Sequence, residues 1–126
     1  MRVVTPAAAA GATATTDFPP ASEPGRVVEV VFVPAAAITI NATNFRRLRV
    51  LNVSRGNAVV ASKDFSAGTA GAATAITIPL AAGDPPFVSE GDVLRVSSEP
   101  VGTGQADPGG QVFATVQQLA AAAGQF

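Results

Sequence analysis

The chain has 126 residues and a formal net charge of −1, and it contains no His, Cys, Trp or Tyr although 48% of its residues are hydrophobic. Without imidazole or thiol it lacks the commonest general base, the commonest metal ligand and the most reactive nucleophile, so we expect a binding or assembly function without metal or cofactor. A charge so near zero argues against nucleic acid as a partner, and no apolar run approaches the roughly 20 residues that cross a bilayer, so we expect no membrane partner either.

The first part of the chain is poor in large apolar side chains. Residues 5–25 are almost entirely Ala, Thr, Pro, Gly and Ser, with Phe18 as the sole large apolar group. Such a segment cannot bury enough surface to order itself. We therefore predict that residues 1–25 form an extended N-terminal arm that is ordered only against another subunit or a neighbouring protein. The candidate contact residues in this arm are Thr15, Thr16, Asp17, Phe18 and Pro19.

From residue 26 onward, short runs rich in Val, Ile and Leu alternate with Gly, Pro, Asn and Asp, a pattern typical of strands and turns. Strands are predicted over residues 26–33, 38–40, 45–53, 58–65, 74–80, 93–98 and 111–119. The first strand places Val28, Val30 and Phe32 on one face. The later strands direct the following side chains inward: Ile76, Ile78, Leu80, Leu94, Val96, Val112, Ala114 and Val116. This pattern predicts an all-β fold, a single antiparallel β-sandwich or jelly-roll-like domain over residues 26–119, with a C-terminal tail over residues 120–126.

The strand over residues 45–53 carries three of the eight cationic residues. Arg47 and Arg49 share a face of the strand, where they either bind the carboxylates of a partner through bidentate contacts or are simply solvated. Arg46 lies on the opposite, apolar face. If it is partly buried it requires an acidic partner, and Asp92 and Asp107 are the candidates.

Two further segments invite a chemical interpretation. Glu90 and Asp92 flank Gly91, and carboxylates this close suggest general acid/base chemistry or a calcium site, but their spacing is not specific and a turn entering a strand is favoured. Residues 102–110 are rich in Gly, yet they lack the Lys-Ser/Thr and the helix that follow a phosphate-binding loop. We expect them to form a sharp corner between two strands.

Residues 34–48 (PAAAITINATNFRRL), the run Gly91-Asp92-Val93-Leu94 and residues 102–110 (GTGQADPGG) together resemble small head proteins of tailed bacteriophages, the capsid decoration, cement or head-stabilisation proteins. The resemblance covers about residues 13–118, and residues 102–110 are its most distinctive part. It implies a virion protein, assembled in the host cytoplasm, that binds the outer surface of the major capsid protein lattice and bridges neighbouring capsomers. It also implies that the N-terminal arm pairs with the shell and that no reaction is catalysed.

Lattice symmetry favours a homotrimer at threefold positions over a dimer or a monomer. Two other functions stay open. A carbohydrate- or surface-binding β-sandwich module is the main alternative, although sugar sites usually offer flat aromatic platforms and this chain has only Phe. A carboxylate-dependent hydrolase that uses Glu90 and Asp92 is the third.

Overall fold

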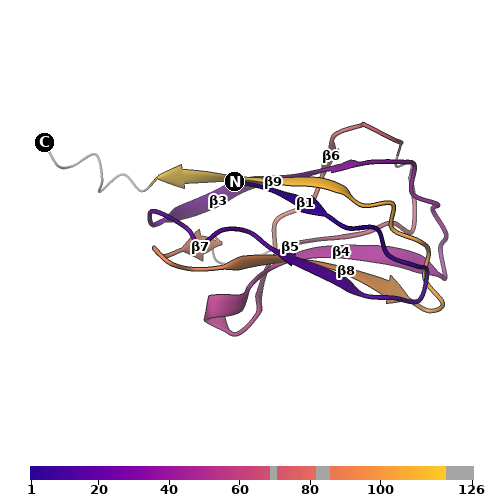
Figure 1. Ribbon diagram of the computed structural model, residues 1–126, viewed down its shortest axis with the longest axis horizontal. Helices are drawn as coiled ribbons and strands as arrows, with labels where there is room; N and C mark the ends of the chain where they lie inside the picture. The colour runs from indigo at the N-terminus through magenta and orange to yellow at the C-terminus, as the bar shows by residue number, and fades with distance from the viewer. Residues whose placement is uncertain (69–70, 82–85, 119–126) are drawn as a thin grey trace, which may run out of the picture.

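The computed structural model describes residues 1–68, 71–81 and 86–118, and in it two antiparallel sheets pack face to face (Figure 1). Sheet 1 contains, in spatial order, β1 (Arg2–Thr5), β9 (Gly110–Gln118), β3 (Gly25–Pro34) and β6 (Ile76–Thr77), with β7 (Phe87–Val88) also paired to β3. Sheet 2 contains β2 (Ala14–Asp17), β8 (Leu94–Val101), β4 (Phe45–Asn52) and β5 (Ala58–Asp64), and a short 3-10 turn, η1 (Val53–Arg55), follows β4. The predicted all-β sandwich is confirmed.

The core lies between the two sheets and follows the alternation of side chains along each strand. Inward positions predicted for the later strands are confirmed, since Ile78, Leu94, Val96, Val112 and Ala114 are buried. Ile76, Leu80 and Val116 are partly buried and pack against the same core.

The first predicted strand forms as β3, but its side chains do not alternate throughout. The register between β3 and β9 shifts between Val27 and Glu29, which marks a β-bulge. Because a bulge inserts one extra residue, the alternation before it is inverted. Val27 is therefore buried and Val28 is 41% exposed, so the prediction that Val28 shares a face with Val30 and Phe32 is wrong.

Two short predicted strands also differ from the structure. Residues 38–40 form no strand, although Ile38 is buried in the core. Of residues 74–80, only Ile76–Thr77 is a strand. After it, the Ile78 amide donates to the Val30 carbonyl in sheet 1 (2.8 Å), and the Ala81 amide donates to the Val60 carbonyl in sheet 2 (2.9 Å). This segment crosses from one sheet to the other and closes that side of the sandwich.

The N-terminal residues belong to both sheets, so the prediction of a separate extended arm over residues 1–25 is wrong. β1 pairs with β9, and β2 pairs with β8. Phe18 is only 2% exposed and belongs to the core. Main-chain hydrogen bonds to a longer neighbouring strand do not depend on side-chain size, so a segment poor in apolar residues is ordered by its own chain. The sandwich therefore includes residues before 26, and the predicted tail over residues 120–126 lies outside the described residues.

Arg46 holds the connection between β1 and β2 in place. Its side chain is 1% exposed. Its Nε donates to the Gln105 carbonyl (2.9 Å), and its terminal nitrogens donate to the carbonyls of Ala12 (2.7 Å) and Ala9 (2.7 Å). The guanidinium is thus satisfied by backbone oxygens of two loops. Burial lowers the pKa of Arg46, while the charge of Asp107 raises it.

Asp107, one of the two predicted acidic partners of Arg46, acts on it through its charge and not through a hydrogen bond. Its carboxylate is buried and accepts hydrogen bonds from the Ser98 hydroxyl (2.5 Å) and the Gly109 amide (2.8 Å). Its backbone exchanges two hydrogen bonds with Ala8 (2.8 and 2.9 Å). The other candidate, Asp92, binds different partners, which are described below.

The glycine-rich residues 102–110 form the corner between β8 and β9, as the sequence predicts. Gly104 has a φ of +71°, and a Cβ there would lie 2.2 Å from the carbonyl oxygen of Ala10. Only glycine allows the loop to approach residues 9–12 this closely. The most distinctive segment of the resemblance to phage head proteins therefore has a structural role in this chain.

We expect Arg46→Met to lower the free energy of unfolding by about 3 kcal/mol, because it removes the charged hydrogen bonds that join the Gln105, Ala12 and Ala9 carbonyls to β4. Urea unfolding measures the change. Arg47→Met is the matched control on the same strand, and it should cost less than about 1 kcal/mol because its ion pair is partly exposed. A loss for Arg46→Met no larger than that of the control would contradict the role assigned to Arg46.

A chain that begins at Phe18 lacks β1 and β2 and should not fold cooperatively. The loss of residues 1–17 uncovers the edges of β9 and β8, and it removes the Ala9 and Ala12 carbonyls that accept hydrogen bonds from Arg46. Circular dichroism during heating tests this expectation. A truncated chain that melts cooperatively at the temperature of the full chain would restore the interpretation of an independent arm.

Candidate functional site

Four of the predicted contact residues gather on one surface, the outer face of sheet 2. On β4, Arg46 and Leu48 point into the core, so Arg47 and Arg49 point outward. On β2, Thr15 and Asp17 are exposed, whereas Thr16 between them is half-buried. Strands β2, β8 and β4 are neighbours, so the structure brings the outward residues of β2 and β4 onto a single face.

The charges on this face are paired within the chain. Three ion pairs link neighbouring strands: Arg47–Asp64 (2.7 Å), Arg49–Glu99 (2.5 Å) and Arg95–Asp17 (2.6 Å). The hydrogen bond to Asp64 raises the pKa of Arg47, and the hydrogen bond from Arg95 lowers the pKa of Asp17. The acidic groups of a partner would therefore have to displace acids that these arginines already hold.

A shallow hollow of about 480 Å³ lies at one side of this face. It is lined by Arg47, Arg49, Val59, Ser62, Lys63, Asp64 and Pro79. Lys63 reaches over the Phe65 ring, with Nζ 5.7 Å from the ring centre. Since the hollow carries both signs of charge, it favours no single class of ligand.

The remaining predicted contact residues are divided between surface and interior. Pro19 is exposed. Phe18 cannot touch a partner while the core is intact, because its side chain is buried between the sheets, so its prediction as a contact residue is wrong. The error has the same origin as the predicted arm: a lone large apolar residue in a polar segment is also what anchors that segment to a core.

The outer face of sheet 1 carries apolar side chains that the sequence pattern did not single out, beside the polar Arg2, Glu29, Gln111 and Thr115. Val4 on β1 is 64% exposed and Phe113 on β9 is 37% exposed. On β3, Val31 lies opposite Phe113, and Val33 lies opposite Gln111, which also faces Val4. We call Val4, Val31, Val33 and Phe113 the apolar strip. The signal was present in the sequence, since residues 26–33 carry valines on both faces of the strand.

A groove of about 420 Å³ continues the apolar strip at one end. Its lining includes Val4 and Val33 of the strip together with Pro34, Ala35 and Pro108. Clustered exposed apolar side chains often mark a protein contact surface, whereas scattered ones carry no such meaning. The strip and its groove are therefore the best candidate contact surface on the molecule.

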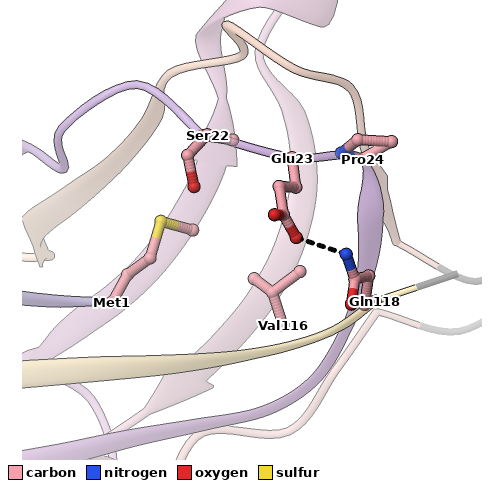
Figure 2. Close-up of a pocket in the computed structure, with 7 residues that line it drawn as sticks. Met1, Ser22, Glu23, Pro24, Val116 and Gln118 are labelled. Carbon is pink, nitrogen blue, oxygen red and sulfur yellow. Dashed lines mark hydrogen bonds between the residues drawn. The ribbon is translucent and has the colours of Figure 1, made fainter. Parts of the chain in front are cut away.

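A smaller pocket of about 230 Å³ lies where the end of β9 meets residues 21–24 (Figure 2). Met1 and Val116 give it an apolar part, and Ser22 adds a hydroxyl. Glu23 accepts a hydrogen bond of 2.5 Å from the Gln118 side chain, as Figure 2 shows. This pair uses the main polar groups of the pocket, so little remains to orient a ligand.

Glu90 and Asp92, the two carboxylates that flank Gly91, lie in different environments. Glu90 is exposed, whereas Asp92 is largely buried. The Asp92 Oδ2 atom accepts hydrogen bonds from the Ser89 amide (2.9 Å), the Asn52 side chain (3.0 Å) and Arg55 Nε (3.0 Å). These donors, the Ser89 amide foremost, lower the pKa of Asp92. Asp92 therefore ties the turn before β8 to η1.

Comparison with known proteins adds no assignment: no family model, no curated protein and no solved structure matches the chain. Within residues 1–68, 71–81 and 86–118, His, Cys, Asp and Glu form no group of three that would hold a metal ion. In the same part of the chain, no helix has the length and apolar character needed to cross a bilayer.

Asp92→Asn should lower the free energy of unfolding by about 1–3 kcal/mol at neutral pH, because an amide cannot accept all three hydrogen bonds. The pKa of Asp92 is lowered on folding, so its stabilisation is complete above the unfolded value and is lost as pH falls through the folded value. The difference in free energy of unfolding between wild type and variant, measured by urea unfolding, should therefore shrink only as pH falls below 3.8, the ordinary value for Asp. Glu90→Gln is the control variant, and its free energy of unfolding should equal that of wild type. If the difference in free energy of unfolding between wild type and Asp92→Asn does not shrink in acid, the role assigned to Asp92 is contradicted.

Proposed function

We propose that this protein is a structural component of a virus particle, which binds the outer surface of the capsid of a tailed bacteriophage and holds neighbouring capsomers together. Its partner in this proposal is the major capsid protein. The sequence resemblance to decoration proteins supports the phage assignment. The observation that carries the proposal is the apolar strip, because clustered exposed apolar side chains suit contact with another protein.

The two outer faces differ in what it costs to cover them. Burying the apolar strip is favourable, at about 25 cal/mol per Å² of apolar surface removed from water. Covering the face of sheet 2 would strip water from three ion pairs that are already formed within the chain, and that desolvation costs free energy. We therefore assign the shell contact to sheet 1, and the predicted contacts at Arg47 and Arg49 to the face that stays in water.

Cementing by a folded face differs from cementing by an arm. Because β1 and β2 are held by β9 and β8, the N-terminal residues lose no further freedom when the protein attaches. The face is preorganised, and a modest contact repeated over many copies still adds a large total to the stability of a shell. Binding by each subunit can then be weak while the particle gains strength.

The carbohydrate-binding alternative has one observation in its favour. Phe87 is 46% exposed and lies opposite Arg26, whose guanidinium donates to the Gln117 side chain (3.3 Å). A ring beside such polar groups can stack on a sugar. Phe113 lies between Arg2 on β1 and Val31 on β3, and its place in the apolar strip suits a protein partner better. This alternative would be favoured if the wild-type chain bound a glycan array but not phage heads, and if Phe87→Ala abolished the glycan binding.

The proposal is tested by sedimenting the purified chain with phage heads that lack it. We expect saturable binding and heads that resist heat better once decorated. Phe113→Glu should weaken binding at least about tenfold, because a charge replaces a ring that must be desolvated. Arg47→Gln is the matched variant on the other face and should bind like wild type, and thermal melts establish that both variants fold.

The possible outcomes separate the parts of this proposal. Failure of the wild-type chain to bind heads or to alter their heat resistance would overturn the function. Binding that is lost in Arg47→Gln and retained in Phe113→Glu would keep the function and reverse the assignment of the face.

A further inference from the structure

The two long sides of the sandwich differ in whether another segment of the chain pairs with their edge strands. On the side of β5 and β6, residues 76–81 pair with β3 and then with β5, so they cover both sheets. On the opposite side lie β1 and β2, seen in indigo in Figure 1, and in the described part of the chain each has a strand neighbour on one side only. An unpaired strand edge is a ready template for pairing with another chain.

The register identifies which backbone groups of β1 face away from the sheet. Met1 and Ala114 exchange both of their main-chain hydrogen bonds (2.7 and 2.8 Å). Because bonded and non-bonded positions alternate along an antiparallel ladder, Val3 and Thr5 also bond to β9. Arg2 and Val4 therefore direct their N–H and C=O groups outward, away from β9.

The same argument applies to β2 but leads to a polar edge. The Phe18 amide donates to the Leu94 carbonyl (2.9 Å), so Thr15 and Asp17 direct their backbone groups outward. The Asp17 side chain is already held by Arg95. The edge of β1 carries Val4 instead, the most exposed of the large apolar side chains among the described residues. Of the two open edges, β1 is thus the one with apolar surface left to bury.

We propose that β1 pairs in antiparallel fashion with β1 of a second copy of this chain, across a two-fold axis normal to sheet 1. The strand is complementary to itself: Arg2 lies opposite Val4 of the second copy, and each such pair exchanges two main-chain hydrogen bonds. No like charges face one another, and the aliphatic part of Arg2 covers the exposed valine. The two copies of sheet 1 become one continuous sheet, and their apolar strips join into a single surface.

This inference does not depend on the proposed function, because it concerns the isolated chain. Of the oligomers considered from the sequence, it selects the dimer in place of the trimer. If the protein decorates a shell, the joined strips double the width of the contact face. Pairing through a strand of four residues is a small contact, so we expect a dimer that dissociates on dilution.

The test compares proline variants at outward positions of the two open edges. Val4→Pro removes only an N–H that points away from β9, and an edge strand tolerates proline at such a position. Thr15→Pro makes the same change on β2. Analytical ultracentrifugation over roughly a hundredfold range of chain concentration measures the oligomeric state. Wild type and Thr15→Pro should reach the mass of a dimer, and the dissociation constant of Val4→Pro should rise at least about tenfold.

Three results would overturn the inference: a wild-type chain that stays monomeric throughout, a Val4→Pro chain that dimerises as well as wild type, or an equal loss in Thr15→Pro. Hydrogen exchange of the wild-type chain gives an independent reading should Val4→Pro fail to fold. Protection of the Arg2 and Val4 amides that increases with chain concentration supports pairing through β1. Amides that exchange at the same rate at every concentration argue against it.

Discussion

The hydrogen bonds from the buried Arg46 guanidinium to the backbone carbonyls of two loops are the interaction on which the rest of the structure depends. They join residues 9–12, which lead from β1 to β2, to the loop between β8 and β9. A buried cation is tolerated only when its donors are satisfied, and here loop carbonyls supply most of what an acid would otherwise supply. The bonds also place one short strand at the edge of each sheet.

That placement determines the outer surfaces of the molecule. With β1 in place, Val4 extends the apolar strip of β9 and β3, and with β2 in place, Asp17 completes the charge pairs of sheet 2. One face therefore carries the apolar strip, with Arg2 and Gln111 beside it, and the other carries a row of ion pairs formed within the chain. This difference supports our assignment of the shell contact to sheet 1, because the cost of desolvation is low on that face and high on the other.

The N-terminal residues also explain why one side of the sandwich is open. Residues 76–81 cover the far side with their own backbone, whereas β1 and β2 end the sheets without a cover from the rest of the described residues. Proteins commonly protect exposed edges with charge, proline or a bulge, and β1 carries only Arg2 for that purpose. An edge of this kind suits pairing with a second copy, and the apolar strip beside it suits a larger partner.

The sequence by itself determined the fold class, the main strands and most of the inward side chains, because alternation along a strand is a local property that follows from the backbone. It also placed Arg46 on the apolar face of its strand and identified residues 102–110 as a corner. Tertiary structure decided the rest. The strands β1 and β2 have too few apolar residues to be recognised, since their order comes from hydrogen bonds to distant parts of the chain: Arg2 pairs with Phe113 of β9, and Asp17 pairs with Arg95 of β8. The bulge that exposes Val28, the carbonyls around Arg46 and the pairing of Arg47 and Arg49 with acids on other strands are likewise contacts between distant residues, which no local pattern contains.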